Sequence, residues 1–406
     1  MTEPLAVGRR DPRMWPLYAA GFTTAFGAHA VAASLGSASE DAVTSLLTLG
    51  LLLALYDGAE VLLKPVFGTI ADRVGARPVL LAGLVGFACA SATYVVADEP
   101  AWLWVARLGQ GAAASAFSPA ASSMVARLNP AAKHGRAFGS YGFWKSIGYT
   151  LGPLLGGALI WLGGLQLLFA VTAALALVVA VWALLVVPVV PPLPRTRQTV
   201  LDLARRLADR SFLVPTSALA GATAALSVGV GFLPVTGAAS GLGPVVTGAA
   251  VSVLAGTAAV VQPRAGRALD AGRLRTRTGL VAGLLLAAAG LVAALLPGVV
   301  GVVLAAVLIG AGTGLITPLG FAALAASTPP ARLGQTMGTA ELGRELGDAG
   351  GPVLVAAVAT AASLDAGYVA LALVLAAGPA VVLITTALGR GGSAETLDHG
   401  ERGGER

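Results

Sequence analysis

Long apolar stretches follow one another along almost the whole chain, and they restrict its fold more than any other feature. A helix needs roughly 20 mostly apolar residues to cross a hydrocarbon core about 30 Å thick, because every buried amide must find its partner within the segment. Twelve such stretches are present, at 16–37, 43–67, 78–97, 101–125, 137–161, 165–187, 212–236, 244–262, 279–297, 299–323, 335–361 and 366–388. Only 11% of the residues are charged, against roughly 25% in soluble domains. The sequence therefore predicts an all-α membrane protein with twelve transmembrane helices.

Basic residues are confined to alternate loops and to the tails, apart from four of the 26 that fall inside predicted spans. The opposite loops carry only acidic charge, at Glu40, Asp41, Asp98, Glu99 and Asp365. An excess of basic residues marks the cytoplasmic side of a membrane protein. We therefore expect a multi-pass protein of the plasma (inner) membrane with both termini in the cytoplasm. Its net charge of +6 then reflects topology and contact with lipid headgroups rather than binding of nucleic acid.

The two halves of the chain repeat one another at an offset of 198 or 199 residues. The matches include Pro65 with Pro263, Asp72 with Asp270, Pro119 with Pro318, Lys145 with Arg344, and Gly152–Pro153 with Gly351–Pro352. The predicted organisation is a six-helix bundle at 1–187, a cytoplasmic linker with a short amphipathic helix at 188–211, a second six-helix bundle at 212–388, and a polar tail at 389–406. Repeats related by an axis along the membrane normal are typical of transporters that alternate access to a central site.

Between the second and third spans the chain carries GTIADRVGAR at 68–77, with a partial copy, GRALDAGR, at 266–273. Gly68 allows close helix approach, Gly75 supplies a tight turn, and Asp72 can accept bonds from amides at a helix N-terminus. The motif resembles the signature loop of the major facilitator superfamily. That resemblance implies a cytoplasmic latch between the halves, formed by Gly68, Asp72, Arg73, Gly75, Arg77 and Asp270.

Two further motifs extend the resemblance to the twelve-helix drug:proton antiporters of that superfamily. RLGQGAAAS at 107–115 is similar to a motif whose intramembrane arginine is associated with proton coupling, and GYTLGPLLGG at 148–157 is similar to the glycine-proline motif of exporters. We expect the second motif to form a flat, kinked face against the opposite half, through Gly148, Gly152, Pro153, Gly156 and Gly157. Many such antiporters carry a carboxylate in the first helix, where this chain offers only His29.

Ionisable side chains inside the spans are the candidates for coupling transport to protons, because a charge in the bilayer costs at least about 2.5–3.5 kcal/mol. We expect proton-coupling groups among His29, Asp57, Glu60, Arg107, Glu345 and Asp348, with Glu60 first and Asp57 second. The alternative is structural: Glu60 with Lys64, and Glu341 or Glu345 with Arg344, are spaced for ion pairs along a helix. His29 can titrate near neutral pH or simply hydrogen-bond at a helix interface.

Lys145 and Arg344 lie at matching positions of the two halves, where they could bind an anionic substrate from both sides. Aromatic residues beside Lys145 suit an amphipathic organic molecule. The candidate substrate-binding residues are Gln110, Tyr141, Trp144, Lys145 and Arg344. The alternative for the aromatic rings is packing against lipid or between helices.

These features favour a secondary active exporter of a small organic molecule, driven by a proton gradient. A facilitator or proton symporter that imports a metabolite or organic anion is the alternative, and a non-transporting receptor is a third hypothesis. An enzyme is disfavoured, because no nucleophile–His–acid set, metal-ligand cluster or phosphate-binding loop is present in the sequence. We expect no cofactor, and a monomer whose partners are a small molecule, protons and membrane lipids.

Overall fold

The computed structural model describes residues 11–35, 46–97, 99–192 and 208–378, and nearly all of them are helical. The long helices are α1 (Trp15–Leu35), α2 (Leu46–Val74), α3 (Ala76–Val96), α4 (Pro100–Arg127), α5 (His134–Val186), α7 (Arg210–Ala239), α8 (Pro244–Asp270), α9 (Thr276–Ala293), α10 (Gly298–Ser327) and α11 (Leu333–Ala361). A shorter apolar helix follows at Leu364–Gly378. The predicted amphipathic helix of the linker and the polar tail lie largely or wholly outside the described residues.

Each predicted span coincides with a helix, and the fold is the predicted twelve-helix arrangement in two bundles. The fifth and sixth spans are joined in α5, which breaks at Gly163 and Gly164. Gly164 has a φ of 68°, a conformation that glycine adopts at no steric cost. By length and composition alone, six of the described helices are long and apolar enough to cross a membrane. Helices α2 and α11 each carry several charges, and those of Glu60, Lys64, Glu341 and Glu345 lie where the two bundles meet.

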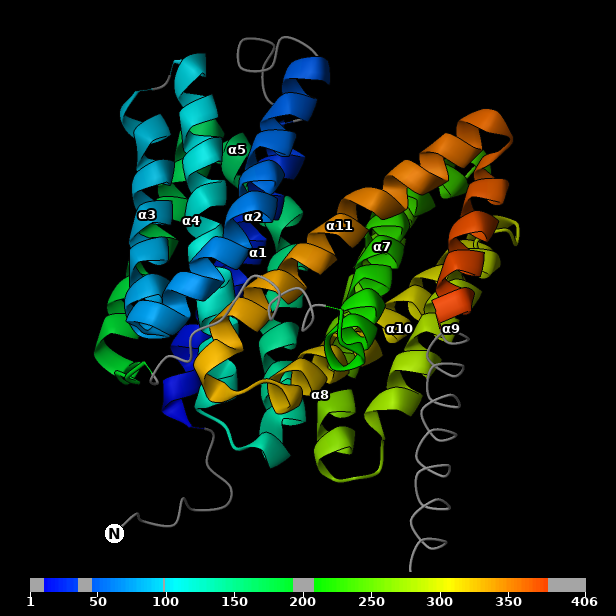
Figure 1. Cartoon of the computed structure of the whole chain (residues 1–406). Coiled ribbons are helices and arrows are strands. Elements are labelled where there is room, and N and C mark those ends of the chain that lie inside the picture. The colour runs from blue at the N-terminus through cyan, green and yellow to red at the C-terminus, as the bar shows by residue number, and fades with distance from the viewer. Residues whose placement is uncertain (1–10, 36–45, 98, 193–207, 379–406) are drawn as a thin grey trace, which may run out of the picture.

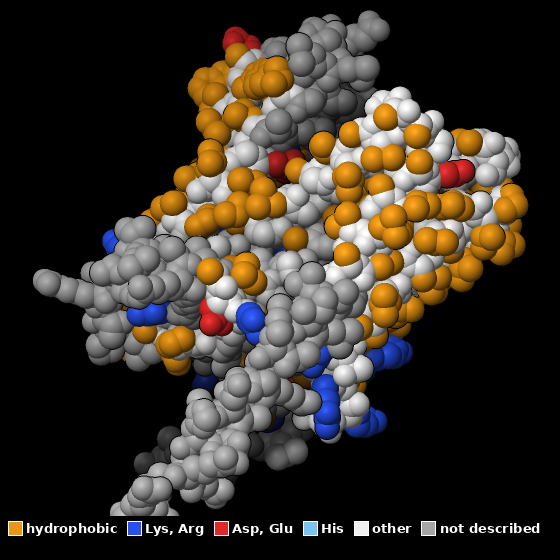
Figure 2. All heavy atoms as spheres, turned by 45° about the vertical axis from the view of Figure 1, so that its right-hand side comes forward, with side chains coloured by type: hydrophobic (Ala, Val, Ile, Leu, Met, Phe, Trp, Pro, Cys, Tyr) orange, Lys and Arg blue, Asp and Glu red, His pale blue; other side chains and the backbone are white. Residues whose placement is uncertain are grey.

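The two bundles are in contact at one end of the molecule and spread apart at the other (Figure 1). We call the closed end the latch end: there α2 and α8 finish, and α5 and α11 begin. Two helix pairs join the bundles, α2 with α11 and α5 with α8, and we call these contacts the two seams. Basic side chains gather at the latch end, and an apolar band covers the flank beyond it (Figure 2). This distribution fits a multi-pass membrane protein.

Glycines let the helices of the two seams approach closely. A Cβ added at Gly338 of α11 would meet the carbonyl oxygen of Lys64 on α2, and one added at Gly139 of α5 would lie 2.6 Å from the carbonyl oxygen of Gln262 on α8. Gly139 and Gly338 are themselves a matched pair of the duplication. The halves therefore use one backbone contact twice, once at each seam.

The sequence led us to expect that the glycine-proline motif of α5 faces the opposite half. In the structure it faces its own half instead. Added Cβ atoms at Gly148, Gly152 and Gly156 would all meet α1 of the same half, while one at Gly157 would meet no atom within 4 Å. Only the first turns of α5, near the latch end, reach α8. Beyond Pro153, which lies inside the helix, the motif holds α5 against α1.

We expect Gly156→Ala to lower the thermal stability of the purified protein, because its Cβ would lie 2.8 Å from the carbonyl oxygen of Ala30. Forcing atoms into a packed interface costs about 1–3 kcal/mol. Gly157→Ala is the matched control, since its Cβ enters open space. Unfolding temperatures in detergent should fall for the first variant only; equal temperatures for the two would contradict this packing.

Candidate functional site

The α2/α11 seam contains a lysine that is shared by carboxylates from both halves. Lys64, in the middle of α2, is 1% exposed. Its Nζ lies 2.7 Å from Glu60 Oε2 one turn earlier on α2, and 2.5 Å from Glu345 Oε1 on α11. The hydroxyl of Tyr56 donates to the other oxygen of Glu60, at 3.3 Å. An ion pair at Lys64 therefore joins the two halves directly.

A second carboxylate of α11, that of Glu341, forms ion pairs with the other cations of this region. Glu341 is fully buried, and its Oε2 lies 3.2 Å from Arg344 Nη1 and 3.5 Å from Lys145 Nζ of α5. Lys64 Nζ lies 3.9 Å from the same oxygen. We call this group the seam cluster; its members are Glu60, Lys64, Lys145, Glu341, Arg344 and Glu345. Its three positive and three negative charges balance, which offsets the cost of removing them from water.

Beside the seam cluster lies an open cavity between the halves. Helix α5 supplies one wall, and α7, α8, α10 and α11 supply the other. Phe138 of α5 and Phe321 of α10 stack across it with ring centroids 5.6 Å apart. Next to them, Gln262 of α8 donates from Nε2 to the hydroxyl oxygen of Ser146 on α5, at 2.8 Å. The cavity thus combines an aromatic face with polar and charged groups, as small-molecule sites do.

The predicted substrate-binding residues divide into two groups. Tyr141, Lys145 and Arg344 line the cavity. Trp144 instead packs edge-on against Trp15, 5.6 Å between ring centroids. Gln110 is fully buried and donates to Ser91 Oγ at 2.8 Å, which ties α4 to α3.

Sequence reasoning did not select Ser146 or Gln262, although the duplication contained a signal for both. At the offsets of 198 and 199, Gln262 corresponds to Lys64 and Ser146 corresponds to Glu345. The Gln262–Ser146 hydrogen bond is thus the counterpart, at the α5/α8 seam, of the Lys64–Glu345 ion pair at the α2/α11 seam. One seam holds a charged contact and the other a neutral one.

The other predicted coupling residues surround the seam cluster without joining it. Arg107 is 1% exposed; its guanidinium lies 4.3 Å from the centre of the Tyr56 ring and donates to Gln110 Oε1 at 3.4 Å. Within the described part of the chain it forms no ion pair. Tyr56 thereby connects Arg107 to Glu60.

Three further residues predicted to couple transport to protons are Asp57, Asp348 and His29. Asp57 of α2 and Asp348 of α11 are exposed, and acidic side chains are visible in the hollow between the halves (Figure 2). His29 is half-buried, with Nδ1 3.1 Å from the carbonyl oxygen of Ala25 and its ring edge-on to Tyr149 at 4.3 Å. Tyr149 lines the cavity, so His29 reaches that site through one aromatic ring.

At the latch end, two aspartates each hold the start of a helix in the opposite half. Asp72 accepts from the amides of Gly334 and Gln335 in the first turn of α11, both at 2.7 Å. Asp270 accepts from the amides of Gly135 and Arg136 in the first turn of α5, at 2.8 and 2.7 Å. A carboxylate at a helix N-terminus meets unpaired amides and a favourable dipole. Both aspartates reach the opposite half because α2 and α8 continue as helices beyond their predicted ends, to Val74 and Asp270.

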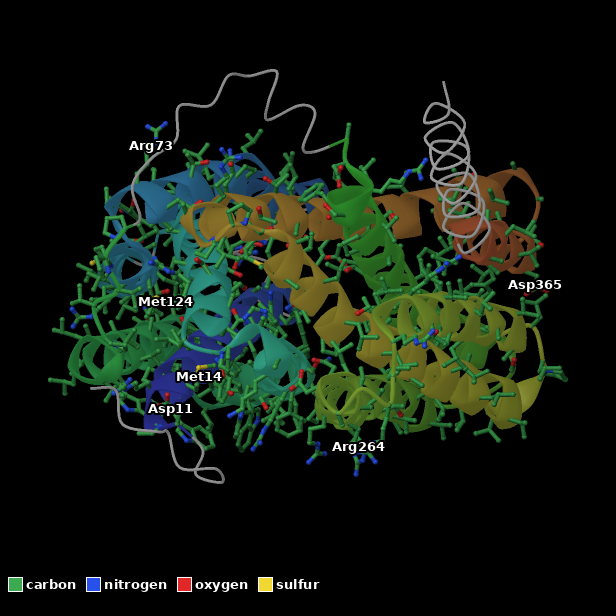
Figure 3. All side chains as sticks on the ribbon, turned by 60° about the horizontal axis from the view of Figure 1, so that its bottom comes forward. Asp11, Met14, Arg73, Met124, Arg264 and Asp365 are labelled. Atoms are coloured by element: carbon green, nitrogen blue, oxygen red, sulfur yellow. The ribbon has the colours of Figure 1, made fainter. Side chains whose placement is uncertain are left out.

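The other predicted latch residues have different surroundings. Gly68 lies against Gly334, and Gly75, with a φ of 101°, turns the chain from α2 into α3. Arg77 donates to the carbonyl oxygen of Leu184 at 2.6 Å, which is a contact within its own half. Arg73 is exposed and points outward from the edge of that half, as does Arg264 in the other half (Figure 3). The two aspartates and Gly68 therefore make the inter-half contact.

No group of three or more His, Cys, Asp or Glu residues that could hold a metal ion occurs among the described residues. The site offers hydrogen bonds, ion pairs and aromatic faces for binding a small molecule.

A family model and solved structures match most of the chain, and curated relatives match about a quarter of it. The sequence model of the Major Facilitator Superfamily matches residues 17–273 and again 216–401. A tetracycline resistance protein, class B, of Escherichia coli is 36% identical over 110 residues, which are 27% of this chain and 27% of that protein. The match thus spans about a quarter of that relative.

Solved structures share the fold at low sequence identity. The human organic anion transporter MFSD10 (TETRAN) superposes with a TM-score of 0.74 at 19% identity, over 92% of this chain and 99% of that one. A variant of the Escherichia coli fucose:proton symporter FucP gives a TM-score of 0.74 at 15% identity, over 91% and 98% of the two chains. With two six-helix bundles, a duplicated latch and a family model that matches both halves, this chain is a transporter, not an enzyme, and belongs to the Major Facilitator Superfamily.

Proposed function

We propose that this protein is a proton-coupled exporter of small amphipathic organic molecules that works by alternating access. The observation that carries the proposal is the sharing of Lys64 between Glu60 of its own half and Glu345 of the other half. Protonating Glu345 removes the closer of the two charges of α11 that hold Lys64, leaving Glu341 Oε2 at 3.9 Å. Lys64 then remains neutralised by Glu60, so the seam can separate without leaving a buried cation unpaired.

The arrangement of the two bundles supports an outward-open state. Basic side chains mark the latch end as the cytoplasmic end by the positive-inside rule, and the bundles are in contact there and apart at the far end (Figure 1). Asp57 and Asp348 are exposed, and in this proposal they receive external protons. Protonation of Glu345 in this state would weaken the contact between the halves at the closed end. An antiporter requires this order, in which a proton binds from outside before the cytoplasmic end opens.

The cavity beside the seam cluster is the proposed substrate site. Its stacked Phe138 and Phe321 suit an apolar or aromatic portion of a substrate, and its polar residues suit a hydrogen-bonding group. The tetracycline resistance relative supports an organic substrate moved outward. Import with protons is the second candidate, favoured by the likeness in fold to a fucose:proton symporter. The direction of proton movement separates the two.

We expect Glu345→Gln to abolish substrate-driven proton movement while leaving the protein folded. Glutamine keeps an acceptor for Lys64 but cannot be protonated at neutral pH. Purified protein in vesicles that enclose a pH-sensitive dye should move protons when tetracycline is added, and the variant should not.

Glu99→Gln is the matched control, because this carboxylate is exposed at the start of α4, away from the seam cluster. Its proton movement should equal that of the wild type. Proton movement retained in Glu345→Gln would remove this residue from the coupling, and substrate and protons moving in the same direction would favour import.

The latch aspartates should control how often the cytoplasmic end opens. Each carboxylate accepts two bonds, and hydrogen bonds to charged groups contribute about 1.5–3 kcal/mol each. Asp72→Ala should therefore favour opening by roughly tenfold or more. A cysteine at buried Thr336, in a background with Cys89 replaced by serine, should react faster with a membrane-impermeant maleimide in this variant.

Asp209→Ala provides the control for loss of a capping carboxylate. Asp209 accepts from the amide of Ser211 at 2.7 Å, within the start of α7 and within one half. Its loss should leave the labelling rate at position 336 unchanged. Equal acceleration by both substitutions would mean that general destabilisation, rather than the latch, limits opening.

A further inference from the structure

We infer that Gln262 and Glu341 form a subsite for a hydrogen-bond donor of the transported molecule, a hydroxyl or a primary or secondary ammonium group. This inference rests on the proposed function, because it names the substrate class of the same cavity. It assigns to Gln262 a binding role that the charge pattern of the sequence did not indicate.

Gln262 Oε1 and Glu341 Oε1 are buried acceptor atoms in the cavity wall that have no hydrogen-bond partner among the described residues. The hydroxyl of Tyr141, which can donate as well as accept, is a third polar atom of this wall without such a partner. Gln262 is 4% exposed and Glu341 is fully buried, and both line the cavity. An unpaired buried acceptor is costly, whereas one that meets a ligand donor is not. Gln262 Oε1 and Glu341 Oε1 can each accept a further hydrogen bond, so they favour a ligand that carries a hydrogen-bond donor.

The orientation of the Gln262 amide follows from its partner. Its Nε2 donates to Ser146 Oγ, so the Oε1 atom is the free end of the amide. Space for that oxygen depends on Gly142, since a Cβ there would overlap Gln262 Oε1. At the duplicated position of Gly142 the other half carries Glu341. The two acceptors come from α8 and α11, and both lie beside the same stretch of α5, near Gly142 and Lys145.

The cavity lining carries Lys145, Arg344 and Glu341, and the ion pairs among them, rather than its net charge, argue against an anionic group at this subsite. Lys145 and Arg344 both lie against Glu341 Oε2, at 3.5 and 3.2 Å. An anion would have to displace an internal carboxylate from these two cations and would then face that carboxylate at close range. A donor group on the ligand requires neither change. The inference thus places a neutral or cationic donor where the sequence had led us to expect an anion between Lys145 and Arg344.

The two seams then divide the work of the transporter. The charged contact, Lys64–Glu345, lies outside the cavity lining and responds to protons. Its neutral counterpart, Gln262–Ser146, lies in the lining and contacts the substrate. Because each contact joins the halves at one seam, protons and substrate act on the same conformational change through different seams.

The test uses one naphthylethyl scaffold with five headgroups, and measures binding to the purified full-length protein by tryptophan fluorescence. The probes are 2-(2-naphthyl)ethanol and its methyl ether, the corresponding primary amine and its trimethylammonium derivative, and 2-naphthylacetate. We expect the alcohol and the amine to bind at least tenfold more tightly than their fully methylated partners, and the acetate to bind weakly.

Gln262→Leu should remove this preference. Gln262→Glu, which keeps the acceptor, should retain it and shift it toward the amine. Thr317→Val is the matched control, because Thr317 also lines the cavity but its hydroxyl donates within its own helix, to the carbonyl oxygen of Thr313 at 2.9 Å. That control should leave the preference intact.

Equal binding of donor and methylated probes overturns the inference, as do tight binding of the acetate, absence of binding by both donor probes, or a preference that survives Gln262→Leu. Where Gln262→Leu does not fold, loss of the donor preference in Gln262→Glu overturns it as well. Tetracycline-driven proton movement is measured separately, so export can be confirmed while this substrate class is rejected, and the reverse.

Discussion

A buried lysine shared between two bundles is the interaction on which the proposed working of this structure depends. Lys64 is removed from solvent by the close approach of α2 and α11, and it remains charged at low cost only because carboxylates of both helices reach it. The glycines that let the helices touch and the charges that join them are thus parts of one contact. Separating the halves requires that the lysine keep one partner, and Glu60 provides it.

The duplication places a second contact with the same geometry at the α5/α8 seam and fills it differently. Gln262 and Ser146 form a neutral hydrogen bond where Lys64 and Glu345 form an ion pair. A neutral pair has no proton to exchange in the physiological range, whereas a carboxylate beside a lysine can exchange one. In the proposed mechanism, two copies of one backbone framework therefore have two chemical roles. The latch aspartates, by contrast, are the same residue type in both halves and make the same contact with the first turn of a helix in the opposite half.

Several particular expectations depended on which helix faces which, and these required the structure. Gly148, Gly152 and Gly156 do form a packing face, but against α1 of their own half. Trp144 is close to Lys145 in sequence yet packs against Trp15 rather than in the cavity lining. Residue type and spacing predict that a face is flat or aromatic. They do not predict its partner, because that depends on how the helix is rotated in the bundle.

By itself the sequence determined that this chain crosses a membrane as twelve helices in two related bundles, because backbone amides in lipid have no other means of pairing. It also identified the intramembrane charges, since their cost makes them conspicuous in an apolar chain. Only the tertiary structure decided that Lys64 meets Glu345, 281 residues away, and that Gln262 meets Ser146 beside a cavity. Contacts across the seams depend on the relative positions of the two bundles, and neither hydropathy nor helical periodicity encodes those positions.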